Sequence, residues 1–299
     1  NNLSDGRGKI DEILVLPQKT KETKFPSTRY MGSKSTLLPY ISKILENEKP
    51  GTVLDAFSGS GVVSYHFKKM GYKVISNDFL SYSSTVTLAL VENKEVLLTG
   101  NDLDFLLKKN RRAGKFIQST FSGLYFHDED NKFLDNTSAN IDLLTCKYKK
   151  AIAFAALSRA CLKRRPRGIF TYVGFKYDDG RKDLSFSLRE HFLFSVNEIN
   201  KAVFDNGKDS LSLNFNALNL DTEVPDLVYL DPPYFSKHSD NDYVRRYHFI
   251  EGLCRGWEGI DLQEHTITKK FKKYDSPFDT KEGTYGAFEM LFEKYKKSK

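Results

Sequence analysis

The sequence predicts an α/β fold in which a parallel sheet, flanked by helices, is interrupted by a long insertion. First, the apolar run TVLDAF at 52–57 leads into a glycine-containing turn at 58–61. Second, a helical pattern and another β-branched run at 73–78 follow, so these elements fill about thirty residues, the size of one βαβ unit. Third, the run LVYL at 227–230 ends in the tetrapeptide DPPY at 231–234. Two prolines remove two backbone donors, so they can only follow a strand whose pairing has ended.

Composition sets the class of protein before any motif is considered. The chain has 299 residues, of which 39% are hydrophobic and 28% charged, as in an ordinary soluble globular protein. Its net charge of +7 and pI near 9.0 favour a polyanionic partner. The cysteines, Cys146, Cys161 and Cys254, show no disulfide or metal-ligand spacing, which fits a reducing cytoplasm and predicts no metal site. No apolar run approaches the ~18 residues that cross a bilayer, so we expect no membrane association.

The first part of the chain carries the beginning of the sheet. Residues 1–26 are polar and are expected to form an N-terminal tail. A helix is predicted after the segment RYMGSKS at 29–35, ending near 49–51, because apolar residues recur there at helical spacing. The residues with this spacing are Leu37, Leu38, Ile41, Ile44 and Leu45. The strands at 52–57 and 73–78 enclose a helix at 62–70, for which Gly71 is the expected C-cap, and a further helix is expected at 80–91.

The remainder is expected to hold an insertion and the end of the sheet. We assign 27–95 and 211–299 to a catalytic domain and 96–210 to an inserted helical, target-recognition region. The insertion is predicted to contain helices near 140–162 and 188–204, with β-leaning or irregular pieces such as 169–177 between them. Strands are expected at 211–218 and 226–230, and helices at 243–253 and 285–295. Because such a sheet normally continues after this last helix, its final strands are expected to be missing from this chain or supplied by a second chain.

The glycine turn and the next strand predict a nucleoside site. Glycines at 59 and 61 let the backbone approach a ligand closely. Asp78 lies at the tip of the following strand, where a carboxylate accepts hydrogen bonds from both ribose hydroxyls. Ser64 stands where a dinucleotide fingerprint needs its third glycine, and the chain has no P-loop motif. A ligand without a pyrophosphate, such as S-adenosylmethionine, is therefore favoured. Asp55 would hold its ammonium, and Lys34 or amides near Gly32 its carboxylate.

Three motifs in one order resemble the alpha-group DNA N6-adenine methyltransferases, the DNA adenine methylase family of restriction-modification systems. They are RYMGSK at 29–34, DAFSGSG at 55–61 followed by Asn77-Asp78, and DPPY at 231–234. The resemblance covers 26–91 and 211–253, and implies a Rossmann-like sheet that binds S-adenosylmethionine. Asn216 departs from the family, which often has an acidic residue there. The implied cofactor pocket comprises Tyr30, Met31, Gly32, Ser33, Lys34, Asp55, Ala56, Phe57, Ser58, Gly59, Gly61, Asp78, Asn216 and Ala217.

The same resemblance assigns catalysis to the tetrapeptide Asp231, Pro232, Pro233 and Tyr234. An adenine amino group is a poor nucleophile because its lone pair is delocalised into the ring. Hydrogen bonds from this group to the Asp231 carboxylate and the Pro232 carbonyl would strengthen as charge develops on nitrogen. Tyr234 would stack on the base, which must leave the stack of double-stranded DNA to reach the pocket. Cytosine-N4 relatives usually carry Ser in place of Asp231, so the acid favours adenine.

Basic residues of the insertion are the candidates for DNA contacts. Lys and Arg clusters contact phosphates and, less often, guanine edges, although charge runs are commonly solvated surface. Tyr243, Arg245 and Arg246 follow the tetrapeptide closely and are expected to hold the flipped strand, unless they are merely the surface of a helix. The candidates within the insertion are Lys163, Arg164, Arg165, Arg167, Lys176, Arg181 and Lys182.

Several other functions share part of this pattern. A methyltransferase of RNA adenine, cytosine N4 or protein glutamine has a similar cofactor turn, but does not need a long basic insertion. A DNA-binding subunit without activity would be expected to lose Asp231 or Tyr234, which are both present. The DNA-binding or catalytic half of a split enzyme remains open. Ser64 and the DPPY turn argue against a nicotinamide oxidoreductase. A cognate restriction endonuclease is an expected partner, and the expected location is the cytoplasm, near the nucleoid.

Overall fold

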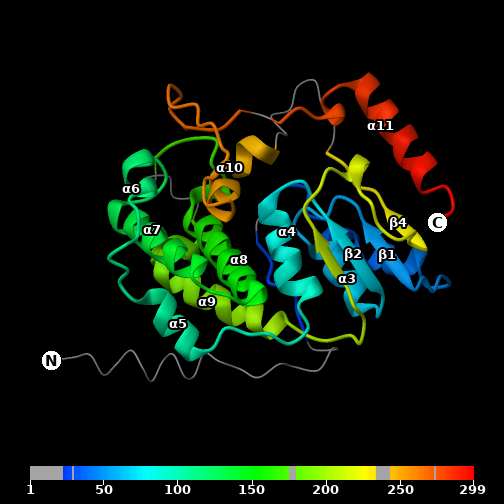
Figure 1. Cartoon of the computed structure of the whole chain (residues 1–299), viewed down its shortest axis with the longest axis horizontal. Coiled ribbons are helices and arrows are strands. Elements are labelled where there is room, and N and C mark those ends of the chain that lie inside the picture. Colours follow the sequence, from blue (N-terminus) through cyan, green and yellow to red (C-terminus); the bar gives the residue numbers. More distant parts are fainter. Residues whose placement is uncertain (1–22, 29, 175–179, 234–242, 273) are drawn as a thin grey trace.

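The sheet is parallel throughout (Figure 1). The computed structural model describes residues 23–28, 30–174, 180–233, 243–272 and 274–299. In these residues the sheet has four strands in the order β3-β2-β1-β4, which confirms the predicted α/β class with a parallel sheet. The strands are β1 (Thr52–Asp55), β2 (Lys73–Asn77), β3 (Leu211–Leu213) and β4 (Leu227–Tyr229), the last two shorter than expected.

Both faces of the sheet are buried, which explains why its strands are apolar almost without alternation. Val53 and Val74 point to one face and join the larger core. Helices α3 (Val62–Lys69) and α4 (Ser81–Thr87) contribute to that core, and α4 continues as a π-helix, η2 (Leu88–Glu92). Leu54 and Ile75 point to the other face, which α11 (Lys281–Lys294) covers.

The predicted helix after the N-terminal motif is present as η1 (Ser35–Leu37) and α2 (Leu38–Ile44). The predicted C-cap glycine of α3, Gly71, has a positive φ of 90°. In the last part of the chain, α10 (Tyr243–Cys254) follows the DPPY tetrapeptide, and the short turns η5 (Ala217–Asn219) and η6 (Pro277–Asp279) lie near the sheet ends.

The insertion is a helical layer that packs beside the sheet and shares its larger core (Figure 1). Helix α8 is its centre, with every residue from Ala151 to Leu162 buried. This explains why that stretch has no polar face. The other helices of the layer surround α8 or link it to the sheet. The elements are α5 (Gly100–Leu107), α6 (Phe116–Thr120), α7 (Asp128–Asp142), α8 (Lys147–Arg164), η3 (Pro166–Gly168), η4 (Lys182–Ser185) and α9 (Leu188–Ala202).

One prediction for the insertion is wrong. A single helix from 140 to 162 is not formed, because α7 ends at Asp142 and the chain turns before α8 begins at Lys147. Asn140 holds the end of α7 against α5 by donating to the carbonyls of Leu106 and Lys108, which fixes the reversal. The described part of the stretch expected to be β-leaning or irregular, 169–174, is irregular and forms no strand.

Strand β4 lies at one edge of the sheet within the described residues. There, the Lys299 amide donates to the Asp226 carbonyl and the Val228 amide donates to the Lys299 carbonyl, which is the pattern of a parallel pairing. None of the described helices is long and apolar enough to cross a membrane.

Candidate active site

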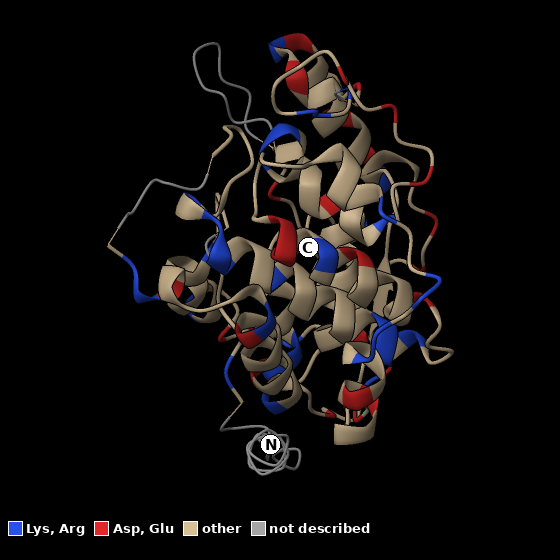
Figure 2. Cartoon of the chain, turned by 90° about the vertical axis from the view of Figure 1, so that its left-hand side faces the viewer, with Lys and Arg blue, Asp and Glu red and all other residues tan. Residues whose placement is uncertain are grey.

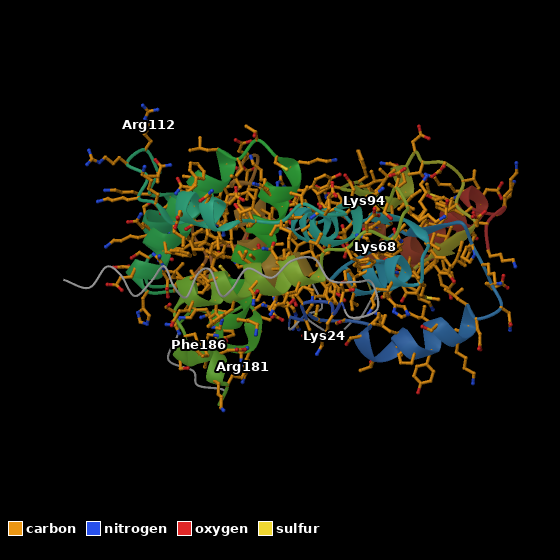
Figure 3. The ribbon with its side chains drawn as sticks, turned by 90° about the horizontal axis from the view of Figure 1, so that it is seen from below. Lys24, Lys68, Lys94, Arg112, Arg181 and Phe186 are labelled. Atoms are coloured by element: carbon orange, nitrogen blue, oxygen red, sulfur yellow. The ribbon has the colours of Figure 1, made fainter. Side chains whose placement is uncertain are left out.

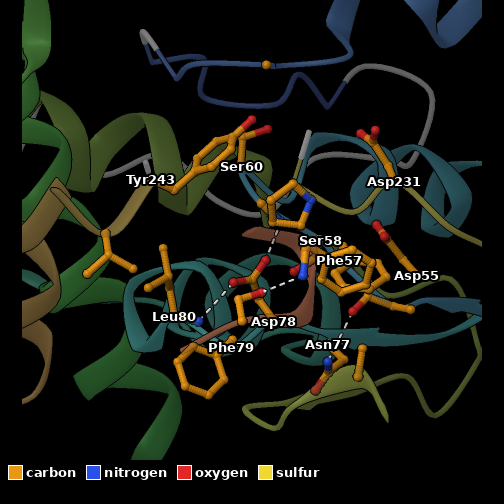
Figure 4. Close-up of a pocket in the computed structure, with 18 of the residues that line it drawn as sticks. Asp55, Phe57, Ser58, Ser60, Asn77, Asp78, Phe79, Leu80, Asp231 and Tyr243 are labelled. Carbon is orange, nitrogen blue, oxygen red and sulfur yellow. Dashed lines mark hydrogen bonds between the residues drawn. The ribbon is translucent and has the colours of Figure 1, made fainter. Parts of the chain in front are cut away.

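A cavity of about 350 Å³ lies where β1, β2 and β4 end (Figure 4). The carboxyl ends of parallel strands are where α/β sheets bind ligands. Asp55 lines the cavity from β1, Asp78 from just beyond β2, and Asp231 from just beyond β4. Three carboxylates that are far apart in the sequence therefore face one space.

The cavity takes in most of the residues predicted to bind a cofactor. All of those candidates line it except Ser33 and Gly61. Gly61 is instead the N-cap of α3, with a φ of 79°. An added Cβ there would also crowd Thr87 at 3.1 Å, so the position requires glycine. Of the catalytic candidates, Asp231 and Pro233 line the cavity, Pro232 is buried beside it, and Tyr234 lies outside the described residues.

Asp55 has one hydrogen-bonded oxygen and one that is unpartnered. Its side chain is buried, and Oδ2 accepts a bond of 2.6 Å from the Ser64 hydroxyl. Oδ1 is buried without a hydrogen-bond partner among the described residues. Burial raises the pKa of Asp55 to about 7, although the Ser64 bond opposes this. Because a buried acceptor without a donor is costly, the site fits a cationic donor such as an ammonium group.

Asp78 is fixed by the backbone on either side of it. Its Oδ2 accepts from the Gly59 amide at 2.7 Å, and its Oδ1 accepts from the Leu80 amide at 2.9 Å. Burial raises the pKa of Asp78 to about 6 despite these two bonds. Each carboxylate oxygen keeps a second lone pair, so the group can still accept from a ligand hydroxyl.

Sequence reasoning missed the part that Asn77 plays in holding the strand ends together. Its amide nitrogen donates to the carbonyls of Ala56 and Phe215, at 3.1 and 3.0 Å, and its Oδ1 accepts from the Phe215 amide at 3.0 Å. One buried side chain thus ties the end of β1 to the loop that follows β3. The only signal in the sequence was its place beside Asp78.

Lys34 lines the cavity, but its ammonium group contacts other groups of the protein. Its ammonium lies 2.5 Å from the Asp231 carboxylate and also donates to the Gly32 carbonyl at 3.1 Å. The side chains of Lys34 and Asp231 are only 15% and 17% exposed, so water screens this pair less than a surface ion pair. An ion pair therefore joins the RYMGSK segment to the DPPY tetrapeptide.

A wall of aromatic rings was not predicted. Phe79 and Phe215 line the cavity with 48% and 57% of their surface exposed. The Tyr274 ring contacts Phe79 with centroids 4.9 Å apart, and Phe278 meets Phe57 edge-on at 5.4 Å. Such faces suit a flat heterocycle. Phe79 and Phe215 could have been found as neighbours of Asp78 and Asn216, but nothing local indicates that residues 274–279 reach this site.

The prediction that Arg165 contacts DNA is wrong. Its side chain is fully buried and donates to the carbonyls of Ile169, Tyr172 and Gly174. The guanidinium also lies over the Tyr125 ring, at 5.2 Å. Arg165 thus satisfies backbone carbonyls of 169–174 that would have been paired if this stretch formed a strand.

The other basic candidates divide into residues that bond to other residues of the protein and residues that are exposed. Lys163 pairs with Asp183 at 3.5 Å, Arg164 pairs with Asp130 at 3.6 Å, and Arg181 donates to the Arg165 carbonyl. Figure 3 labels Arg181 at the margin of the helical layer. By contrast, Arg167 and Lys182 are exposed. Lys176 lies outside the described residues, Tyr243 and Arg245 line the cavity, and Arg246 does not.

Arg167 has an unusual backbone conformation, with a φ of 57° in the left-handed region. Non-glycine residues adopt this region only when the surrounding structure requires it, and such residues cluster at functional sites. Figure 2 shows Lys and Arg interspersed with Asp and Glu over one side of the molecule. A contact at Arg167 would therefore depend on its local geometry rather than on a uniformly positive face.

Comparisons with known proteins identify the family of this chain. Residues 30–296 match the family described as D12 class N6 adenine-specific DNA methyltransferase. Type II methyltransferase M2.HphI of Haemophilus parahaemolyticus is 32% identical over 91% of this chain and 81% of its own length. Modification methylase StsI of Streptococcus sanguinis is 28% identical over 85% of this chain and 40% of its own, and Type II methyltransferase M.FokI of Planomicrobium okeanokoites is 24% identical over 89% and 42%.

The chain thus spans most of the first relative and about two fifths of the other two. No solved structure matches significantly. The match to the family extends over nearly all of the chain that the structure describes, and it excludes the nicotinamide oxidoreductase alternative. This protein belongs to the D12 class of N6 adenine-specific DNA methyltransferases.

Proposed function

We propose that this enzyme transfers a methyl group from S-adenosylmethionine to N6 of an adenine turned out of a specific sequence in double-stranded DNA. The observation that carries this proposal is that Asp231, the candidate for adenine, shares one cavity with Asp55 and Asp78, the candidates for the methyl donor. One cavity lined in this way can hold the two reacting groups next to each other. Such positioning contributes ~7–11 kcal/mol in well-oriented systems.

The residues present fit S-adenosylmethionine. The unpartnered Oδ1 of Asp55 would accept from its ammonium, and the backbone-fixed carboxylate of Asp78 from its ribose hydroxyls. The faces of Phe79 and Phe215 would cover its adenine ring. When bound, the donor supplies an electrophilic methyl group on its sulfonium.

The turn at Asp231 acts on the nucleophile. The Asp231 carboxylate and the Pro232 carbonyl accept from the adenine amino group, which localises the nitrogen lone pair for attack. These bonds strengthen as positive charge develops, so they stabilise the transition state more than the ground state. Stacking by Tyr234 remains part of the proposal.

Lys34 has a role different from the one its motif implies. Because its ammonium contacts both Asp231 and the Gly32 carbonyl, we assign it to orienting the catalytic carboxylate. It would hold Asp231 at the cavity wall before the base arrives. Side chains that position a reacting group contribute through the precision of that geometry.

Exposed cations are the candidates for holding the DNA. Arg167 and Lys182 extend from the helical layer, and Arg245 lines the cavity beside Asp231. The net charge of +7 supports association with the duplex. We keep a cytoplasmic location and a cognate restriction endonuclease as proposals that rest on the family alone.

The test compares Asp231→Asn and Asp231→Ala with wild type. Methyl transfer to DNA should fall by more than ~100-fold in both variants, as when a transition-state donor or acceptor is removed. Donor binding, measured by calorimetry, should stay within about tenfold, a difference of ~1.4 kcal/mol. Asp221→Ala removes an exposed carboxylate outside the cavity and should leave both quantities unchanged. Full activity in Asp231→Ala would refute the assignment.

A further inference from the structure

One face of α10 contacts both walls of the cavity that we assign to the methyl donor. Tyr243, Tyr247 and Glu251 are four residues apart and so lie along one side of the helix. The Tyr247 hydroxyl accepts from the Met31 amide at 2.8 Å, and its ring stacks on Tyr30 with centroids 4.9 Å apart and planes 4° from parallel. This residue fixes the N-terminal wall.

Glu251 fixes the start of α4, next to the cavity. Its two carboxylate oxygens accept from the Ser81 and Tyr82 amides, at 3.0 and 2.9 Å. These are the first amides of α4, the helix that begins just after Asp78, and the α4 N-cap residue, Leu80, makes no side-chain cap of its own. Glu251 is 1% exposed, so this cap from another helix is fully within the core.

Tyr243 completes the contact at the mouth of the cavity. Gly32 has a φ of 73°, and a Cβ at this position would overlap the Tyr243 hydroxyl oxygen while lying 3.6 Å from Tyr243 Cζ. The Tyr243 and Tyr30 ring centroids are 5.9 Å apart. Three side chains on one side of α10 thus hold residues 30–32 and 81–82. In the sequence, this helix begins nine residues after Tyr234 of the tetrapeptide.

We propose that α10 couples the two substrates: donor binding against 30–34 and 78–82 positions α10 and thereby raises the affinity for DNA, with Tyr247 as the principal positioning residue. This inference rests on the proposed function. A ligand that fixes these two segments also fixes the helix bonded to both, and the Lys34 ion pair joins the first of these segments to Asp231 of the adenine-binding turn. By linkage, DNA must raise donor affinity by the same factor.

The experiment measures this coupling in a Tyr247→Phe variant, which keeps the ring and loses the acceptor for Met31. The dissociation constant of a fluorescent duplex that the wild type methylates is measured with and without saturating S-adenosylhomocysteine. In the wild type the ratio should lie within the usual range of about 5–150-fold. In Tyr247→Phe it should fall at least threefold. Tyr65→Phe is the matched control, because it also removes one buried tyrosine bond, of 2.7 Å to the Ala202 carbonyl, outside the cavity.

A second pair of variants tests the helix contact independently of Tyr247. Gly32→Ala should reduce the coupling ratio, and adding Tyr243→Phe should restore part of it, because the hydroxyl that the new methyl group meets is then gone. Melting temperatures separate this recovery from a general change in stability. Failure of Tyr243→Phe to restore any coupling would remove the contact from the mechanism.

Three results would overturn the inference. They are a wild-type ratio of one, an unchanged ratio in Tyr247→Phe, and an equal fall in Tyr247→Phe and Tyr65→Phe. The methylation assay on the same wild-type sample distinguishes these from failure of the proposed function. An enzyme that methylates adenine but shows no coupling contradicts only the role of α10, whereas one that methylates no DNA contradicts the proposed function itself.

Discussion

Asp55 and Asp78 end neighbouring strands, yet the protein uses their carboxylates differently. The oxygens of Asp78 each accept one backbone amide, so this group is held in place before any ligand arrives. Asp55 instead keeps a buried oxygen without a partner, which makes its ionised form costly in the free enzyme. A cationic ligand would supply the missing partner, so the two residues suit the neutral and the charged parts of one donor.

The raised pKa of Asp55 predicts how donor binding depends on pH. With a pKa of about 7, the free enzyme holds this proton at lower pH and must release it to bind an ammonium. Donor affinity should therefore rise about tenfold between pH 6 and pH 8, following the ionised fraction of this group. Calorimetric titration with S-adenosylmethionine at several pH values measures this change.

The matched variant is Asp55→Asn, which should bind the donor weakly and with little dependence on pH. The same shift has an opposite effect on the unliganded fold. Its free energy of unfolding should fall as the pH rises from 3.8 towards 7, because the unfolded chain releases this proton first. Donor affinity that is flat with pH in the wild type would contradict the role given to Asp55.

Lys34 can be assigned by separating binding from turnover. In Lys34→Met, loss of the contact with Asp231 should lower kcat by roughly tenfold or more while donor affinity changes less than threefold, since only the positioning of the nucleophile is impaired. Single-turnover methylation and calorimetry provide the two numbers. Weaker donor binding with an unchanged kcat would instead support a contact with the donor carboxylate.

Single site residues could be predicted from the sequence where a motif fixes both the residue type and its place at a strand end. Asp55, Asp78 and Asp231 all line the cavity as expected. The partner of Lys34 was not predictable, because both a ligand and a protein carboxylate attract an ammonium. Asn77 was missed because its three hydrogen bonds are to backbone groups that come together only in the folded protein.

Among the elements, the segment after α8 is organised by a single buried cation. The Arg165 side chain collects backbone carbonyls that no strand or helix satisfies, and the exposed Arg167 lies two residues further on in a left-handed conformation. From the sequence alone, a basic run of this kind predicts a single exposed surface. In the fold, its members have opposite functions, because one supports the loop from within and the other faces solvent.

This contrast predicts different outcomes for two variants. Arg165→Met leaves buried carbonyls without donors and should lower the free energy of unfolding by roughly 3 kcal/mol or more. Arg167→Ala should leave stability nearly unchanged, weaken DNA binding and reduce its salt slope by about one counterion. Urea denaturation and binding titrations at several salt concentrations make the comparison. A stable Arg165→Met protein, or an unchanged slope in Arg167→Ala, would contradict these assignments.

The limits of two helices could be predicted closely from the sequence. Helix α9 and helix α10 follow their predicted limits closely. The break between α7 and α8 was missed because no glycine or proline marks it between 140 and 147. Only the bonds from Asn140 to α5 show that the chain must reverse there, and those partners lie more than thirty residues away.

In the whole molecule, the sheet and the helical insertion form one body around a shared core. The fold class was predictable because strand, glycine turn and helix follow one another locally. The closure of the cavity by 274–279 was not, since this segment meets Phe57 and Phe79 only through the tertiary fold. The net charge of +7 indicates general attraction to DNA. Because Lys and Arg are interspersed with Asp and Glu, we expect a few exposed side chains to recognise the DNA sequence.

The most direct measurement identifies the product. Wild-type protein is incubated with tritiated S-adenosylmethionine and plasmid DNA, the DNA is digested to nucleosides, and the modified positions are mapped by sequencing. We predict label in N6-methyladenine alone, confined to one sequence context and absent with Asp231→Ala. Label in cytosine, or wild-type protein that binds the donor and plasmid yet transfers no methyl group, would contradict adenine methylation at this cavity.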